Sequence, residues 1–152
     1  MKSILVFLLF FSLNAVAQTF TGKVISVENA QIITVLDSLN HTKTIRLAEI
    51  DCPLEPHLFA LPAKEFTTSQ VYETKVKCVI IGLDENGNSV GMIYYGDENK
   101  YLSAEILRYG FGWQNWDTSK SRLLGQIELT SKKMGIGMWA NPAPMSPTKK
   151  NN

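Results

Sequence analysis

Charged and nucleophilic side chains gather in one short segment of the chain. Arg46, Glu49, Asp51 and Cys52 all stand within seven residues and are followed directly by Pro53. If this segment is a strand, alternation places Glu49 and Asp51 on the same face. Arg46 and Asp51 are suited to pair with each other, so a plain ion pair has to be weighed against a binding role. The sequence has no CxxC motif or Cys/His cluster of the kind that binds zinc.

Three segments of the sequence, taken together, resemble the staphylococcal nuclease (thermonuclease) family. They are residues 22–27, 46–54 and 103–110, and the resemblance extends from about residue 20 to residue 144. Members of that family hydrolyse phosphodiester bonds in DNA and RNA with one Ca²⁺ ion. The resemblance therefore implies Ca²⁺ as the cofactor and nucleic acid, or another ligand, as the partner in the cleft.

The resemblance also assigns the Ca²⁺ ligands, and one of the expected carboxylates is missing. Asp51 matches a metal-binding aspartate, and Cys52 would contribute its backbone carbonyl. Gln31 stands where the family has its other metal carboxylate, in the turn after the first strand. An amide oxygen can bind Ca²⁺ but adds no charge, and affinity depends on the charge of the ligands. We therefore expect Ca²⁺ binding to be weak or absent.

Two further catalytic positions of the family are substituted. Arg46 matches the arginine that clamps the scissile phosphate, but Leu54 replaces the glutamate that positions or activates water, and Asn88 replaces the second phosphate-binding arginine. The number of residues from Pro53 to Lys64 equals that of the family pattern, so no insertion shifts Glu55 into the position of the family glutamate, which Leu54 occupies. A general base is typically worth about 10²–10⁴-fold in rate, and one electrostatic stabiliser about 10²–10³-fold. These substitutions predict a degenerate site.

Two functions remain open. The first is an exported nuclease-like domain that is weakly active or inactive and acts by binding through the old cleft. The alternative is an active secreted Ca²⁺-dependent endonuclease. Trp116 is a candidate ligand-binding residue, because the family places base-stacking tyrosines just after the preceding helix, although packing at the rim would also explain it. Clustered Lys and Arg, which nucleic-acid binding usually requires, are scarce, and nothing in the sequence indicates an oligomeric state.

The pattern of expected elements predicts a mainly β fold with helices (α+β), namely a five-stranded OB-fold barrel with three packed helices. β-branched residues and turn signals predict strands over 20–27, 32–36, 43–50, 76–83 and 89–95. Helices are expected over 62–71, 103–109 and 119–134. Pro62 suits a first turn, Ser119 a helix N-cap, and Gly110 and Gly135 helix ends.

The N-terminal residues 1–17 have the features of a signal peptide. Lys2 precedes an apolar run too short to span a bilayer, and residues 15–17 match the small-x-small pattern that signal peptidase accepts. We expect cleavage before Gln18, a periplasmic or secreted location, and no membrane attachment afterwards.

The remaining chain is expected to form one domain over residues 18–144, followed by a polar tail over 145–152. The chain has 15 basic and 14 acidic residues, so removing Lys2 leaves a neutral protein. Cys52 and Cys78 are too few for a disulfide scaffold, although an oxidising compartment would permit a bridge between them.

Overall fold

The computed structural model describes residues 18–140. The expected signal peptide (1–17) and polar tail (145–152) lie outside the described residues. The strands are β1 (Gln18–Asn29), β2 (Ile32–Asp37), β3 (Thr42–Leu47), β4 (Ile50–Asp51), β5 (Lys75–Leu83), β6 (Ser89–Tyr95), β7 (Lys100–Tyr101) and β8 (Trp113–Gln114). The helices are α1 (Ala60–Val71), α2 (Leu102–Arg108), α3 (Arg122–Met134) and a 3-10 turn, η1 (Gly137–Ala140).

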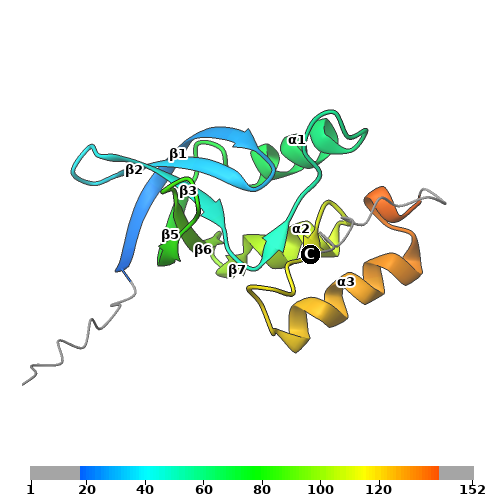
Figure 1. Ribbon diagram of the computed structural model, residues 1–152. Helices are drawn as coiled ribbons and strands as arrows, with labels where there is room; N and C mark the ends of the chain where they lie inside the picture. The colour runs from blue at the N-terminus through cyan, green and yellow to red at the C-terminus, as the bar shows by residue number, and fades with distance from the viewer. Residues whose placement is uncertain (1–17, 141–152) are drawn as a thin grey trace, which may run out of the picture.

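Five long strands form a closed barrel. β1, β2 and β3 make an antiparallel meander, β1 also pairs with β5, and β5 pairs with β6. A parallel pairing of β3 with β6, from Ile45 opposite Ser89 to Leu47 opposite Gly91, closes the barrel. The helices lie on one side of it, with α2 between the barrel and α3 (Figure 1). The predicted five-stranded barrel with three helices is confirmed.

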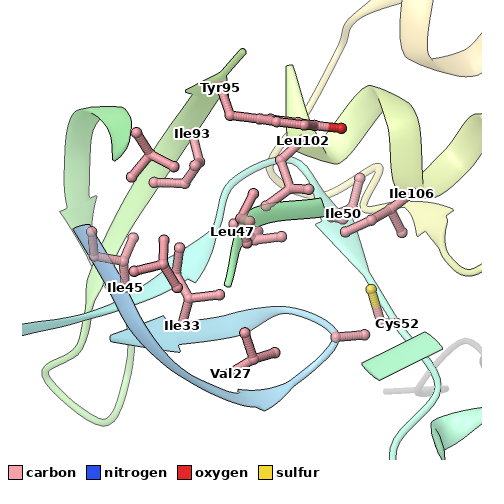
Figure 2. Packing of buried hydrophobic residues seen from close by; sticks show 14 of the residues in the cluster. Val27, Ile33, Ile45, Leu47, Ile50, Cys52, Ile93, Tyr95, Leu102 and Ile106 are labelled. Atoms are coloured by element: carbon pink, nitrogen blue, oxygen red, sulfur yellow. The ribbon is translucent and has the colours of Figure 1, made fainter. Parts of the chain in front are cut away.

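The hydrophobic core fills the barrel and continues without a break to α2. Ile33, Ile45 and Ile93 are fully buried inside the barrel, and Ile50 and Ile106 carry the core toward the helices (Figure 2). Burying a side chain of this size contributes about 1.5–3 kcal/mol relative to exposure. The site residues on β3 and β4 therefore lie on strands that also carry core residues, Leu47 and Ile50.

The predicted strand over 43–50 is interrupted, so the alternation on which the expected placement of Glu49 and Asp51 rested does not apply. β3 ends at Leu47, and a turn at Ala48 and Glu49 precedes the short strand β4. Glu49 has a φ of +71°, a left-handed backbone conformation that residues other than Gly rarely adopt. Alternation of side chains requires continuous extended backbone, which the turn breaks.

The third helix begins later than predicted. Ser121, not Ser119, caps α3, since its hydroxyl accepts the N–H of Leu124 at 3.3 Å. Ser119 is buried and bonded elsewhere. The expected end of the helix at Gly135 is confirmed, with a φ of +61° at that residue. None of the helices within residues 18–140 has the length and apolar character needed to cross a membrane.

Candidate functional site

Asp51, at the end of β4, has both carboxylate oxygens engaged by donors from the protein itself. Arg46, on β3, forms an ion pair with its Oδ1. Asn115, which follows β8, donates from Nδ2 to its Oδ2 at 2.9 Å. The side chains of Arg46 and Asp51 are 23% and 28% exposed. The two sequence candidates are thus brought together, with an amide that the sequence did not single out as the third member.

Gln31, which stands where the family has its other metal carboxylate, is buried and bonds the backbone of a neighbouring strand end. It is only 6% exposed, and its Oε1 accepts the backbone N–H of Cys52 at 2.8 Å. Its backbone carbonyl accepts the N–H of Leu47 at 2.8 Å. The side chain therefore ties the turn between β1 and β2 to the end of β4, and its amide oxygen is already in use.

The residues present do not fit a Ca²⁺ site as they are arranged. A calcium site needs several oxygen ligands, with carboxylates supplying the charge. Here the two oxygens of Asp51 and the amide oxygen of Gln31 already accept hydrogen bonds. Within residues 18–140 no group of three or more His, Cys, Asp or Glu side chains is placed to hold a metal ion. Arg46 supplies a positive charge next to Asp51.

Leu54 and Asn88, at the positions where the family has its glutamate and its second arginine, are uncharged. The side chain of Leu54 is 46% exposed, and it lines a hollow of about 440 Å³ between the β1–β2 turn and α1. Glu55 lines the same hollow. Asn88, at the end of the β5–β6 turn, donates from Nδ2 to Asp84 Oδ2 at 3.2 Å. Its amide is therefore directed to its own hairpin.

Asp84 stays ionised at neutral pH. Partial burial raises the pKa of Asp84, but hydrogen bonds from Asn88 and Asn86 and the charge of Arg46 outweigh it, and the pKa lies below its ordinary value. Arg46 therefore pairs with Asp51, and its charge also favours the ionised form of Asp84. This leaves less uncompensated positive charge for a phosphate than a free arginine would offer.

Glu49 fixes the loop that carries Asn115 and Trp116. Its carboxylate accepts the hydroxyls of Tyr101 at 2.9 Å and Ser119 at 2.8 Å, and its backbone carbonyl accepts the N–H of Asn115 at 2.9 Å. Sequence reasoning missed these contacts, because the partners of Glu49 are 52 to 70 residues away in the chain. Glu49 is committed to this network and is not a replacement metal ligand.

Trp116 lies apart from the Arg46–Asp51 pair. Its indole is 56% exposed and packs against Gly125 of α3, where an added Cβ would come within 3.0 Å of Cη2. The groove that it lines is formed by α3 and contains neither Arg46 nor Asp51. The structure therefore joins Gln31 to Cys52 and Arg46 to Asp51, whereas Trp116 lines a groove on α3 that includes none of these four residues.

Both cysteines are buried free thiols, and no bridge joins them. Burial raises the pKa of Cys78 to about 12 and raises the pKa of Cys52 further. The reactive form of cysteine is the thiolate, so both side chains are unreactive at neutral pH. Cys52 lies in the part of the core near Ile106 (Figure 2).

The structural role of Gln31 gives a first prediction. Replacing Gln31 by Met keeps the volume but removes the acceptor for the buried Cys52 N–H, so we expect unfolding free energy to fall by about 1–3 kcal/mol. Urea denaturation followed by circular dichroism measures the change. Gln126→Met, on the exposed face of α3, is the matched control. A Gln31→Met protein as stable as this control would show that the Gln31–Cys52 bond contributes nothing.

Comparisons with known proteins agree with this architecture. Residues 44–141 match the family model described as "Staphylococcal nuclease homologue". The chain is 26% identical over 129 residues to an "Uncharacterized endonuclease" of Haemophilus influenzae, covering 85% of this chain and 71% of that protein.

Two further relatives carry nuclease names. The chain is 22% identical to "Micrococcal nuclease" of Shigella flexneri over 139 residues, which cover 86% of this chain and 79% of that protein. "Ribonuclease TUDOR 2" of Arabidopsis thaliana is 34% identical over 100 residues, which cover 60% of this chain and 10% of that protein. The family match extends over well more than half of the residues, from β3 through η1. The chain therefore belongs to the staphylococcal nuclease homologue family.

Proposed function

We propose that this domain is a nucleic-acid-binding nuclease homologue whose phosphodiesterase site is degenerate. It cleaves weakly or not at all and acts by binding. The observation that carries the proposal is the state of Asp51, whose two carboxylate oxygens are held by Arg46 and Asn115. A metal-dependent nuclease needs such oxygens for its cation.

Three missing charges support the same function. The neutral side chains of Gln31, Leu54 and Asn88 stand where the family has a metal carboxylate, a base and a phosphate-binding cation. Groups that act as a unit are strongly non-additive, so the loss of the first removes most of what the others could contribute. Arg46 and Asp51 alone can form an ion pair but cannot activate water.

The alternative function is an active secreted Ca²⁺-dependent endonuclease. The names of the relatives from Shigella flexneri and Haemophilus influenzae favour it. In this chain it would require Asp51 to share its carboxylate between a metal ion and its present partners, or to release one of them. A base other than residue 54 would also be needed.

Calcium affinity separates the two functions. We expect a dissociation constant no tighter than about 10⁻⁴–10⁻³ M, because Asp51 is the only family carboxylate present and is already neutralised by Arg46. Titration calorimetry of the purified protein with CaCl₂ tests this. Asp97→Asn, a substitution of an exposed carboxylate outside the site, is the control. Micromolar binding that survives in this control and disappears in Asp51→Asn would favour the active enzyme.

The proposal includes export. The features of residues 1–17 support processing by signal peptidase, which would give a mature protein that begins at Gln18 in the periplasm or outside the cell. Intact-mass measurement of the protein from its native host tests this, with a mass that corresponds to residues 18–152 as the expected result. Soluble protein that still carries residues 1–17 would contradict it.

A further inference from the structure

Gln18 is the residue that signal peptidase would leave at the start of the mature protein, and it already belongs to the barrel. It is part of β1 and lies opposite Ile80 of β5 in an antiparallel pairing. An N-terminal glutamine holds a nucleophile, its α-amine, and an electrophile, its side-chain amide. Because both groups belong to one residue, their reaction is intramolecular and needs no bound partner.

Lys43, on β3, contacts the side-chain amide of Gln18. Its Nζ donates to Oε1 of Gln18 at 3.1 Å. The same Nζ lies 4.8 Å from the ring centroid of Phe20, a cation–π contact that holds the lysine beside β1. No acidic side chain within residues 18–140 forms an ion pair with Lys43. In the sheet β2 lies between β1 and β3, so the contact of Gln18 with Lys43 belongs to the folded barrel and not to a local turn.

A cation at Oε1 favours ring closure of an N-terminal glutamine. The α-amine nitrogen attacks Cδ, and negative charge develops on Oε1, the oxygen to which Lys43 donates. The bond between Cδ and Nε2 then breaks, a proton passes from the α-nitrogen to Nε2, and ammonia leaves. The product is a five-membered lactam, pyroglutamate, and no other reactant is consumed.

Ring closure also removes the repulsion between two positive charges. A neighbouring cation disfavours the protonated form of an amine, and only the unprotonated α-amine can attack. In pyroglutamate the α-nitrogen is an uncharged amide, while Oε1 remains as the carbonyl oxygen of the ring. Lys43 can therefore keep its hydrogen bond in the product without a second cation beside it.

We propose that Gln18 of the exported protein closes to an N-terminal pyroglutamate with assistance from Lys43. The inference rests on the export that is part of the proposed function, because ring closure requires a free amine at Gln18. It adds a modification site that involves neither Arg46 nor Asp51. The modified protein has no N-terminal charge and offers no free α-amine to aminopeptidases.

Mass spectrometry tests the proposal in two ways. The first uses the mature protein from the native host and measures its mass and its N-terminal tryptic peptide, residues 18–23. The peptide locates the change, since a succinimide at Asn86-Gly87 would lose ammonia as well. The second is a time course of purified residues 18–152, freshly released from a fusion by a protease that cuts directly before Gln18, in buffer without other enzymes.

Variants at Lys43 separate ring closure assisted by this residue from unassisted closure. Lys43→Met removes the charge at similar length, and Lys43→Arg keeps a charged donor. Lys77→Met is the matched control, because Lys77 of β5 also lies over an aromatic ring, 5.1 Å from the centroid of Tyr94. The unmodified protein in urea gives the rate without the folded contact. Circular dichroism verifies that each variant is folded.

We expect the host protein to have the mass of residues 18–152 less one ammonia, with the loss located in peptide 18–23. In the time course, Lys43→Met should close about three- to tenfold more slowly than the unmodified protein, because an exposed charge contributes less than a donor in a buried oxyanion hole. Lys43→Arg, which keeps a charge-assisted donor, and Lys77→Met should stay within about twofold of the unmodified protein. In urea all four proteins should close at the same slow rate.

Three results would overturn the inference, and they differ in what they imply. A host protein that begins at Gln18 with an unmodified amine would refute the ring closure and leave export intact. Retention of residues 1–17 would refute export and the inference together. Equal rates for the folded protein, for Lys43→Met and for the urea-unfolded chain would show that Lys43 and the fold take no part in the reaction.

Discussion

Restoring the three missing charges together is expected to raise Ca²⁺-dependent cleavage by at least about 100-fold over the unmodified protein. The variant combines Gln31→Asp, Leu54→Glu and Asn88→Arg, with Arg46 and Asp51 left in place. The metal carboxylate, the base and the phosphate-binding cation act as one unit, so each single substitution should gain little. Cleavage of a fluorescent oligonucleotide, with and without millimolar Ca²⁺, measures the effect.

The hydrogen bond from Asn115 to Asp51 also affects this experiment. Asp51 has to release Asn115 and share its carboxylate with a metal ion, so adding Asn115→Ala to the triple variant should increase the gain. Asp51→Asn in the same background should abolish it. Because Gln31 also holds the Cys52 N–H, the stability of the triple variant has to be measured in parallel. A folded triple variant that gains nothing would show that these three positions do not limit cleavage.

The largest effect on stability is expected at Gly110. This residue has a φ of +70°, and a Cβ here would lie 2.1 Å from the carbonyl oxygen of Ile136. Its own carbonyl accepts the N–H of Met138 at 3.0 Å, which attaches η1 to the end of α2. Gly110→Ala combines backbone strain with overpacking and should cost on the order of 3–5 kcal/mol. Typical domains have about 5–15 kcal/mol of stability, so much of the protein would unfold at moderate temperature.

Substitutions at two other glycines separate the cost of backbone strain from the cost of overpacking. Gly96 has a φ of +69° but open space around its Cβ position, so Gly96→Ala should show the backbone cost alone, about 1–2 kcal/mol. Gly82 has open space and no positive φ, so Gly82→Ala should be close to neutral. Thermal and urea denaturation of the three variants gives the comparison. Equal stability of Gly110→Ala and Gly96→Ala would show that the backbone at Ile136 moves away from the added Cβ without a cost in stability.

Most of the fold could be predicted from the sequence because its signals are local. The Asn-Gly pair predicts the β5–β6 turn, and Gly87 has the positive φ, +79°, that such a turn needs. Gly135 ends α3 in the left-handed conformation, as its position predicts. Runs of β-branched residues locate the barrel strands, since such residues pack well on a pleated surface.

The features that were missed depend on contacts between distant residues. The turn at Glu49 breaks the predicted strand, and the residues that hold its carboxylate, Tyr101 and Ser119, lie far from it in sequence. Ser119 has the residue type of a helix cap, but the same contact uses its hydroxyl, and Ser121 takes the capping role. Asn115 has no recognisable motif, yet its contact with Asp51 gives the site its present form. The residue types indicate which charged groups of the family are missing, whereas only the structure shows the hydrogen bonds that Gln31, Asn88 and Asp51 make.

The central claim is that the chain has kept the nuclease barrel without an effective nuclease site. The most direct test is cleavage of plasmid and single-stranded DNA by the purified mature protein, with millimolar Ca²⁺ and with a chelator. We predict little or no cleavage and no acceleration by Ca²⁺, because Arg46 and Asn115 hold Asp51 and residues 31, 54 and 88 are neutral. Ca²⁺-dependent cleavage that the triple variant does not exceed, and that Asp51→Asn abolishes, would contradict this claim.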